Sequence, residues 1–279
     1  MSKATRASSF KRQLFAGPFA FWMVAFTIIP LALMAVRAFT DGNGSFTLDN
    51  VMAITRPAYL KALGLSLELA FLATLICLVV AYPVALILRH HKHGKGALVI
   101  FVFVLPMWMN FLLRTLAWQS LLEREGVING ILGAIGLPPI EIINTPAAVI
   151  LGMVYNFLPF MILPLYNCIS KIDENTINAA YDLGANRIQT IARVIVPQSF
   201  AGIVSGITMV FVPALTTFVV SDILGGGKVM LIGNVIEQQF TVNYDWSTGA
   251  GLSIVLMLFV LISMMLVNSF DKSGEGRLL

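Results

Sequence analysis

The chain has 279 residues, of which 58% are hydrophobic and only 11% are charged, and its formal net charge at pH 7 is +4. Soluble domains usually carry about 25% charged residues, so this composition excludes an ordinary water-soluble protein and favours one embedded in lipid. The two cysteines, Cys77 and Cys168, both lie within apolar runs. This placement indicates small core residues rather than a disulfide framework or a metal site.

Six long segments carry little or no charge. Each reaches the ~20 residues that a helix needs to cross about 30 Å of hydrocarbon. A segment in lipid must satisfy its backbone hydrogen bonds internally, which favours a helix in each case. The sequence therefore predicts an all-α integral membrane bundle of about six transmembrane helices, with residues 1–279 as a single transmembrane domain. In chain order the segments are 13–36, 62–88, 97–122, 142–170, 194–221 and 246–270.

The first segment follows Lys11 and Arg12, as the apolar part of a cleavable signal peptide also would. Its apolar run is longer than the about 7–15 residues of such a region, which favours a retained helix. We therefore count it among the membrane spans.

The distribution of Lys and Arg predicts the orientation, because short cytoplasmic loops carry an excess of both residues. If the loops alternate between the two sides, twelve of these residues lie on one side and five on the other. This bias places both termini and the loop 171–198 in the cytoplasm. The twelve are Lys3, Arg6, Lys11, Arg12, Arg89, Lys92, Lys95, Lys171, Arg187, Arg193, Lys272 and Arg277, and the five are Arg37, Arg56, Lys61, Arg124 and Lys228.

Three loops are predicted on the outer side. The first contains the sequence Asp-Gly-Asn-Gly at 41–44, a strong turn signal, and the third contains three glycines at 225–227. The second contains an apolar stretch, 127–137, that is too short to span the membrane. This stretch predicts a re-entrant or interfacial helix.

The loop 171–198 has the pattern of a short helix, a glycine turn and a second helix. Asp173 can cap the first helix, with Asn175 as a rival cap. Gly184 can take the left-handed conformation that ends a helix. Pro197 closes the unit.

Ala179, Ala180 and Leu183 would share one small apolar face of the first helix in this loop. Small residues on an exposed helix let the backbone of another protein approach closely, as a docking helix requires. Alanines can also reflect helix propensity alone. The pattern therefore leaves a docking helix and a plain surface helix open.

This loop resembles the EAA loop of the permeases of binding-protein-dependent ABC importers. The pattern of that family is Glu-Ala-Ala, three residues, Gly, nine residues, and then Ile-x-Leu-Pro. The chain matches this spacing throughout, with Asn178 in place of the glutamate and valines at 194 and 196. In the family the loop docks in a groove of a separate ATPase subunit. The resemblance implies that the ATPase-coupling residues here are Asn178, Ala179, Ala180, Asp182, Leu183, Gly184 and Pro197.

The resemblance covers about residues 46–261 and is closest to the spermidine/putrescine (polyamine) type, as the B/H-like partner of a heterodimer. It is carried by 105–106, 111–115, 117–118, 125–129, 158–166, 224–226 and 232–236. It implies a type I, MetI-like permease fold in the bacterial inner membrane that translocates a polyamine. Permeases for other organic ions, phosphonates or ferric iron share much of this framework, so another small solute is the alternative.

The resemblance also implies a set of partners. These are a second permease subunit, a cytoplasmic ABC ATPase dimer that binds ATP and Mg²⁺, and an extracytoplasmic substrate-binding protein. No cofactor is expected in this chain itself.

Charged side chains within membrane segments need a partner or a wet cavity, and three are candidates for the substrate path. Glu68 and Asp222 lie near the outer ends of their segments and could simply face water, whereas Arg114 would pair with a carboxylate or hold helices together. Aromatic rings attract cations, and amides can bind ammonium groups. Residues of these kinds that could line the path, or could instead be anchors or core residues, are Trp108, Asn110, Trp118, Tyr155, Asn156 and Phe218.

No catalytic constellation is present, so an enzyme is not expected. Gly227 and Lys228 are followed by Val229 and do not form a phosphate-binding loop, so energy from ATP must arrive through a partner. A stand-alone secondary transporter or channel is the rival hypothesis. It would need ion-coupling carboxylates in the membrane, for which only Glu68 and Asp222 are available.

Two further patterns are less specific. Gly202 and Gly206 could let the fifth predicted helix pack closely on a partner. His90, His91 and His93 lie in a basic loop, which favours a solvated loop over a metal site.

Overall fold

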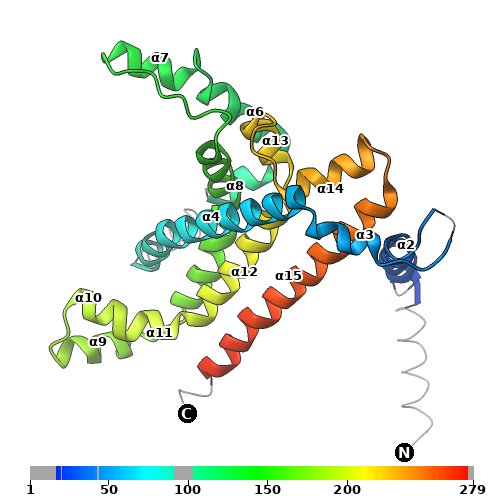
Figure 1. Ribbon diagram of the computed structural model, residues 1–279. Helices are drawn as coiled ribbons and strands as arrows, with labels where there is room; N and C mark the ends of the chain where they lie inside the picture. The colour runs from blue at the N-terminus through cyan, green and yellow to red at the C-terminus, as the bar shows by residue number, and fades with distance from the viewer. Residues whose placement is uncertain (1–16, 20, 43, 91–102, 276–279) are drawn as a thin grey trace, which may run out of the picture. The chain divides into compact units, whose positions relative to one another are not determined.

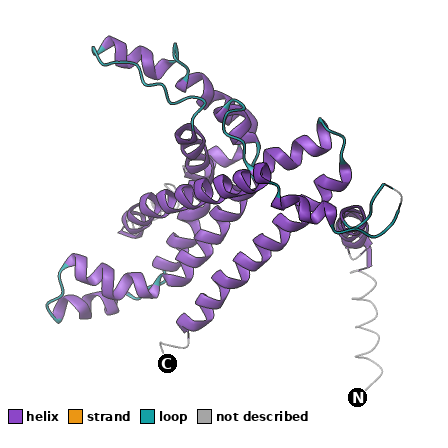
Figure 2. Ribbon diagram, viewed as in Figure 1, coloured by secondary structure: helices purple, strands orange, loops and turns teal. Residues whose placement is uncertain are grey.

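The computed structural model describes residues 17–19, 21–42, 44–90 and 103–275. Within these ranges the regular elements are helices, and the β contact found is an isolated antiparallel bridge between Thr40 and Phe46 (Figures 1 and 2). The predicted all-α class is confirmed. His91 and His93 of the basic loop lie outside the described residues.

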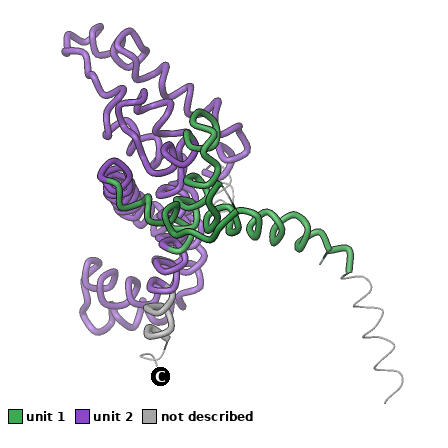
Figure 3. Tube along the Cα trace, turned by 45° about the vertical axis from the view of Figure 1, so that its right-hand side comes forward, with its two compact units in different colours: residues 1–56, 238–258 green, residues 57–237, 259–279 purple. Residues whose placement is uncertain are grey.

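The chain divides into two compact units (Figure 3). Unit 1 comprises Met1–Arg56 and Gln238–Leu258, and unit 2 comprises Pro57–Glu237 and Phe259–Leu279. Two helices, α14 (Ile232–Thr241) and α15 (Trp246–Glu275), pass from one unit to the other. The assignment of residues 1–279 to a single permease domain stays a prediction.

Unit 1 contains the first membrane helix and a short apolar core. The π-helical turn η1 (Val24–Ile28) runs into α2 (Ile29–Ala38), and α3 (Asp49–Met52) and η2 (Ala53–Thr55) follow after a loop. Ala38 packs against Ala250 and Ile254 of α15. The side-chain amide of Asn50 donates to the carbonyl oxygens of Ala38 at 3.3 Å and Thr40 at 3.1 Å, which fixes the loop to the end of α2.

The turn predicted at 41–44 is present in this loop. The N–H of Gly44 donates to the carbonyl of Asp41 at 3.1 Å, and Gly44 has a φ of +83°, a conformation that favours glycine. Asn43 of this turn lies outside the described residues.

The core of unit 2 is built from three long helices, α4 (Pro57–His90), α8 (Pro146–Ile169) and α12 (Phe200–Thr216), which pack on one another. Small side chains recur on α4 at intervals of three or four residues and are all buried. Such side chains let helix backbones approach closely, and this packing holds helices together in lipid, where no hydrophobic effect drives them together. The buried series is Ala62, Ser66, Ala70, Ala73, Cys77, Ala81 and Ala85.

Gly202 and Gly206 bring α12 close to α8. A Cβ on Gly202 would lie 2.7 Å from the Cβ of Cys168 and 2.9 Å from the carbonyl oxygen of Pro164. A Cβ on Gly206 would lie 2.5 Å from the sulfur of Met161. The predicted close packing is confirmed, and the partner is α8 of the same chain.

Within the described residues four helices are long and apolar enough to cross a membrane, and a bent pair could provide a fifth span. The pair, Arg187–Gln198 and Phe200–Thr216, bends by 69°. The four are Gly17–Ala38, Pro57–Arg89, Pro146–Ile169 and Trp246–Val267. The predicted count of about six is therefore approximate.

Two of the predicted segments are interrupted. The start of segment 97–122 lies outside the described residues, and the rest divides into η3 (Leu105–Trp108) and α6 (Phe111–Leu122), because the Asn110 side chain caps a new helix. Segment 194–221 bends at Ser199 and stops at Thr216, before α13 (Val219–Gly225) begins. Hydropathy does not detect such breaks, because the residues around them remain apolar.

Candidate functional site

The coupling loop, residues 171–198, contains the predicted pair of helices, which lie beyond the end of α12 in Figure 1. Helix α9 spans Glu174–Asp182, and the side chain of Asp173 accepts a hydrogen bond from the N–H of Asn175 at 3.0 Å. Asp173 is therefore the N-cap, as predicted, and its rival Asn175 lies in the first turn of the helix.

The end of α9 is a tight turn at Gly184, which has a φ of +83°. The N–H of Gly184 donates to the carbonyl of Tyr181 at 2.9 Å, and the N–H of Ala185 donates to the carbonyl of Ala180 at 3.0 Å. This pair of bonds is the Schellman arrangement, which requires a left-handed residue at this position. The predicted glycine turn is confirmed.

The second arm of the loop begins at Asn186, where Asn186 and Gln189 cap each other reciprocally. This arm contains α10 (Arg187–Thr190), the π-helical turn η4 (Ile191–Ile195) and α11 (Val196–Gln198), with Pro197 exposed in α11. At the bend, the buried Ser199 hydroxyl lies 2.9 Å from the Tyr82 hydroxyl of α4. This hydrogen bond ties the second arm to the helical core.

One face of α9 is open to solvent. Leu183 is 89% exposed, Ala179 and Gly184 are exposed, and Ala180 is half-buried. We call these four residues the docking face. Leaving a leucine exposed rather than buried forgoes roughly 1.5–3 kcal/mol. Asp182, also predicted for coupling, is exposed at the last turn of α9.

The opposite face of α9 lines a groove of about 480 Å³. The other walls of the groove are the end of α4 and the second arm of the loop. Asn178, predicted with the coupling residues, lies on this groove side. The complete lining is Leu86, Ile87, Arg89, Glu174, Ile177, Asn178, Tyr181, Arg187, Ile191 and Ile195.

Four of the substrate-path candidates gather between α6 and α8. The buried guanidinium of Arg114 donates through Nη1 to the carbonyl of Pro106 at 2.7 Å. It also lies 5.7 Å from the ring centroid of Tyr155 and 5.9 Å from that of Phe111. Trp118 packs edge-on against Tyr155, with the ring centroids 5.2 Å apart.

Asn156 completes this α6–α8 cluster and is 1% exposed. Its Nδ2 donates to the carbonyl of Gly152 at 2.9 Å and lies 3.5 Å from the hydroxyl oxygen of Thr115. Two buried atoms of the cluster, Asn156 Oδ1 and Arg114 Nε, have no hydrogen-bond partner among the described residues. The carboxylate expected as one partner of Arg114 is also not found among those residues. The rings and a carbonyl take its place, and Arg114 joins α6 to α8.

The other path candidates are scattered. Asn110 caps α6, since its Oδ1 accepts from two backbone N–H groups, at 2.8 Å and 3.2 Å. Trp108 is 77% exposed in η3, and Phe218 is 41% exposed at the break before α13. Glu68 on α4 and Asp222 on α13 are both exposed.

Asn234 has a structural role that sequence reasoning did not assign. Its Nδ2 donates to the carbonyl of Phe218 at 3.1 Å, and its Oδ1 accepts from the hydroxyl of Ser221 at 2.5 Å and the N–H of Leu231 at 3.1 Å. The side chain therefore joins the start of α14 to the break before α13. Asn234 lies in the segment 232–236, which carried the family resemblance and could have directed attention to it.

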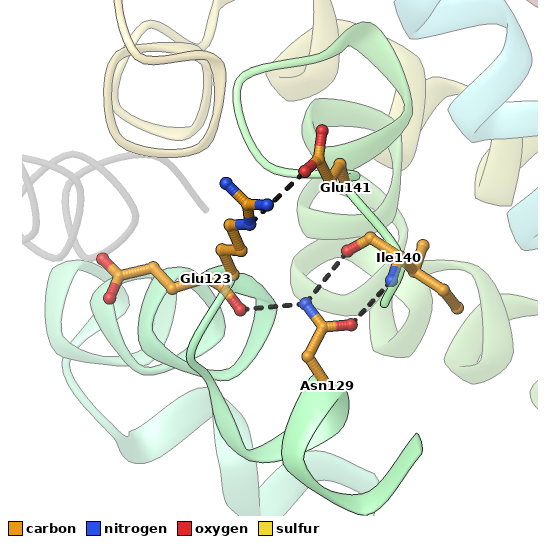
Figure 4. Close-up of polar contacts among 5 residues, drawn as sticks. Glu123, Asn129, Ile140 and Glu141 are labelled. Atoms are coloured by element: carbon orange, nitrogen blue, oxygen red, sulfur yellow. Dashed lines mark hydrogen bonds and ion pairs between the residues drawn. The ribbon is translucent and has the colours of Figure 1, made fainter. Parts of the chain in front are cut away.

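Asn129 has a comparable role in the loop between α6 and α8 (Figure 4). Its side chain exchanges two hydrogen bonds with Ile140, at 3.0 Å and 2.7 Å, and donates to the carbonyl of Glu123 at 3.1 Å. An exposed ion pair, Arg124 to Glu141 at 3.6 Å, closes the same loop. The apolar stretch predicted at 127–137 forms α7 (Val127–Ala134) within it.

The described residues form a helical chain with long apolar spans, as expected of an integral membrane protein. The profile of the family described as "Binding-protein-dependent transport system inner membrane component" matches residues 18–273. The chain belongs to this family, and it is a multi-pass permease of the inner membrane. The predicted family is confirmed.

Two relatives make the assignment narrower. The chain is 41% identical over 245 residues to the spermidine/putrescine transport system permease protein PotB of Escherichia coli (strain K12), covering 85% of this chain and 89% of the relative. It is 39% identical over 259 residues to the PotB protein of Haemophilus influenzae, covering 90% of this chain and 91% of the relative.

Solved structures confirm the fold. A bacterial ABC transporter that imports the acidic polysaccharide alginate contains a chain that matches with a TM-score of 0.80 at 17% identity, over 98% of this chain and 99% of that one. The methionine ABC transporter MetNI matches with a TM-score of 0.58 at 17% identity, over 77% of this chain and 95% of that one. At these identities the likeness establishes the permease fold alone, and the predicted MetI-like fold is confirmed.

Proposed function

We propose that this chain is the permease subunit of a polyamine importer, which carries spermidine or putrescine inward with energy from separate ATPase subunits. Relatives of about 40% identity over most of the chain are spermidine/putrescine permeases by name, which supports the substrate class. A second permease subunit and an external binding protein would complete the transporter.

The exposed docking face of α9 is the observation that carries this proposal. Leu183 projects from a turn that hydrogen bonds hold in one conformation, so its side chain is positioned before any partner arrives. Preorganisation of this kind lowers the entropy lost on binding. A separate ATPase subunit that covers Ala179 and Leu183 would bury the apolar surface that the chain leaves open.

Motion of the docked α9 would reach the core through the second arm of the loop. Ser199 is hydrogen-bonded to Tyr82 of α4 at the 69° bend, and Gly202 lets the following helix, α12, pack closely on α8. Close-packed helices transmit a displacement rather than absorb it, because the interior has few voids. We infer that closure of an ATPase pair moves α12 and α8 together and alters the path.

The substrate path would need carboxylates for a polycation, and Glu68 and Asp222 are our candidates. Among the buried residues of the described chain the charged side chain is a cation, Arg114, which already faces two aromatic rings. Glu68 is exposed on the membrane helix α4, and a carboxylate facing lipid is costly. We infer that the face of α4 bearing Glu68 is turned toward water or the second permease subunit.

Reconstitution tests the proposal. The cognate ATPase, second permease and binding protein, identified from neighbouring genes, are assembled with this chain in proteoliposomes, and uptake of radiolabelled spermidine and putrescine is measured. We expect uptake that requires ATP and the ATPase, and competition by other polyamines but not by a phosphonate or ferric iron. Uptake by the chain alone under an ion gradient would instead support a secondary transporter.

Within the same assay, Glu68→Gln should lower polyamine uptake several-fold, because it removes a carboxylate from the proposed entrance. Glu123→Gln, which changes an exposed carboxylate of the α6–α7 loop, is the matched control and should leave uptake unchanged. Equal uptake by both variants would show that Glu68 is not part of the path. The polyamine substrate would still be tested separately, by the competition experiment.

A further inference from the structure

The groove behind α9 is not explained by the docking face, which lies on the other side of the helix. We propose that this groove binds an anionic phospholipid, with the lipid phosphate between Arg89 and Arg187. Three observations support the proposal, namely the position of the groove at the end of a membrane span, its charge, and its apolar floor.

The groove lies at the end of the candidate membrane span of α4. The span Pro57–Arg89 ends at Arg89, and the two apolar residues Leu86 and Ile87 just before it also line the groove. A long basic side chain at the end of a span reaches the level of the lipid phosphates while its apolar stem stays in hydrocarbon. We infer that the groove lies at the depth of the headgroups, on the side that the Lys and Arg distribution predicts to be cytoplasmic.

The charges in the groove favour an anion. Arg89 and Arg187 both line it, whereas Glu174 is the one carboxylate among the lining residues, so their formal sum is positive. The position that is glutamate in the family pattern is the uncharged Asn178, which also lines the groove. With a carboxylate at 178 the lining would be neutral, so this sequence creates the positive balance.

Arginine suits the phosphate group. Its planar guanidinium carries five N–H donors and pairs with phosphate through two parallel hydrogen bonds. Arg89 uses Nη2 to donate to the carbonyl of Ile172 at 2.9 Å, which holds its side chain at the groove and leaves further donors. Arg187 is exposed at the start of α10 and reaches the groove from the other wall.

The floor of the groove suits a lipid better than a free phosphate. Ile191 and Ile195 of η4 line it together with Leu86 and Ile87 of α4, which provides apolar surface for the first part of an acyl chain. Basic pockets between membrane helices on the cytoplasmic side bind anionic headgroups. A bound lipid would contact α4 and α9 at once and so brace the docking helix against the core.

Lipid titration of the purified full-length chain in mild detergent tests this proposal. Binding of fluorescent phosphatidylglycerol is measured beside phosphatidylcholine, with inorganic phosphate as a competitor. We expect the anionic lipid to bind several-fold more tightly than phosphatidylcholine, and millimolar inorganic phosphate to displace little of it. Equal affinity for both lipids would overturn the proposal, and full displacement by inorganic phosphate would assign the groove to a free anion instead.

Two variants assign the binding to this groove. Arg187→Ala should weaken phosphatidylglycerol binding about fivefold, the loss expected for one basic residue near an anionic lipid. Asn178→Glu should weaken it at least as much, because it makes the lining neutral. Arg193→Ala removes an exposed basic residue of η4 that does not line the groove and should leave binding unchanged.

The proposal fails if Arg193→Ala weakens binding as much as Arg187→Ala, since the attraction would then come from the general positive charge of the loop. It also fails if Asn178→Glu binds phosphatidylglycerol as the unaltered chain does. Thermal unfolding of each variant in the same detergent separates a lost site from a lost fold, because both substitutions are at exposed positions.

Discussion

The helical core and the coupling loop of unit 2 are stabilised in opposite ways. In α8, eleven residues are buried and held by packing against α4, α12 and α13. In α9 no residue is buried, and the helix is defined by its caps at Asp173 and Gly184. The core depends on close approach between helices distant in sequence, whereas the loop depends on local hydrogen bonds and leaves its apolar face exposed.

The largest effect should follow from filling the space at Gly202. Gly202→Leu would place side-chain atoms against the backbone of Pro164, and overpacking of this kind costs about 3 kcal/mol. We expect a large fall in the unfolding temperature, measured by thermal unfolding in detergent. Gly64→Leu is the control, because a Cβ at Gly64 meets nothing within 4 Å. Comparable losses in both variants would show that packing on α8 is not what α12 depends on.

A charge on the docking face should affect function without affecting the fold. Leu183→Asp would place a carboxylate where an apolar partner surface is expected, and the loss of a buried leucine contact, roughly 2 kcal/mol, lowers partner binding by more than tenfold. We expect ATP-driven uptake to fall about tenfold or more, while the thermal stability of the variant is unchanged. Ala192→Asp, an exposed position of the second arm that belongs neither to the docking face nor to the groove, should retain uptake.

Full uptake by Leu183→Asp would mean that the exposed leucine is not covered by a partner. Reduced uptake in both variants would point to a general effect of negative charge on the loop. Either result would contradict the proposal that the loop, unlike the core, buries its apolar face against a partner.

A buried polar contact should have an intermediate effect. Asn234→Ala removes the acceptor of the Leu231 N–H, whereas the Ser221 hydroxyl and the Phe218 carbonyl keep their bond to each other, and we expect a loss of about 2 kcal/mol of stability. Chemical or thermal denaturation measures it. Asn175→Ala, at an exposed position of α9, should change stability by less than about 0.5 kcal/mol. Equal stability of the two variants would contradict the role given to Asn234.

The smallest effect concerns the turn after α9. Gly184→Ala forces a side chain into the left-handed conformation at a cost of about 1 kcal/mol, which should loosen the turn and lower uptake a few-fold. Gly130→Ala lies inside α7 with open space around it, and it should instead increase the stability of the chain slightly. Hydrogen exchange at Ala185 would detect the loosened turn, and unchanged exchange there would contradict the prediction.

Local signals were sufficient to predict the coupling loop. The Asp173 cap, the Gly184 turn and the exposed face of Ala179 and Leu183 all depend on residues a few positions apart, which a sequence displays directly. Long apolar runs likewise predicted the helical class, because length and hydropathy determine whether a helix can cross lipid.

Features that depend on contacts between distant residues were not predictable in the same way. Of the two roles expected for Arg114, the structure shows the one that holds helices together, through the Pro106 carbonyl of η3 and the rings of Phe111 on α6 and Tyr155 on α8. Asn110 was a candidate for the path, and its role as the cap of α6 could not be predicted, because hydropathy does not detect where this helix starts. The groove that contains Asn178 exists only because α9 folds back toward the end of α4.

The central claim is that the docking face lies on the cytoplasmic side, where an ATPase can reach it. Leu183→Cys in a chain without its two native cysteines, labelled with a membrane-impermeant maleimide, tests it directly. We predict labelling in inside-out vesicles and none in intact spheroplasts. Labelling of Cys introduced at 183 in intact spheroplasts would contradict the account, because no cytoplasmic ATPase could then contact α9.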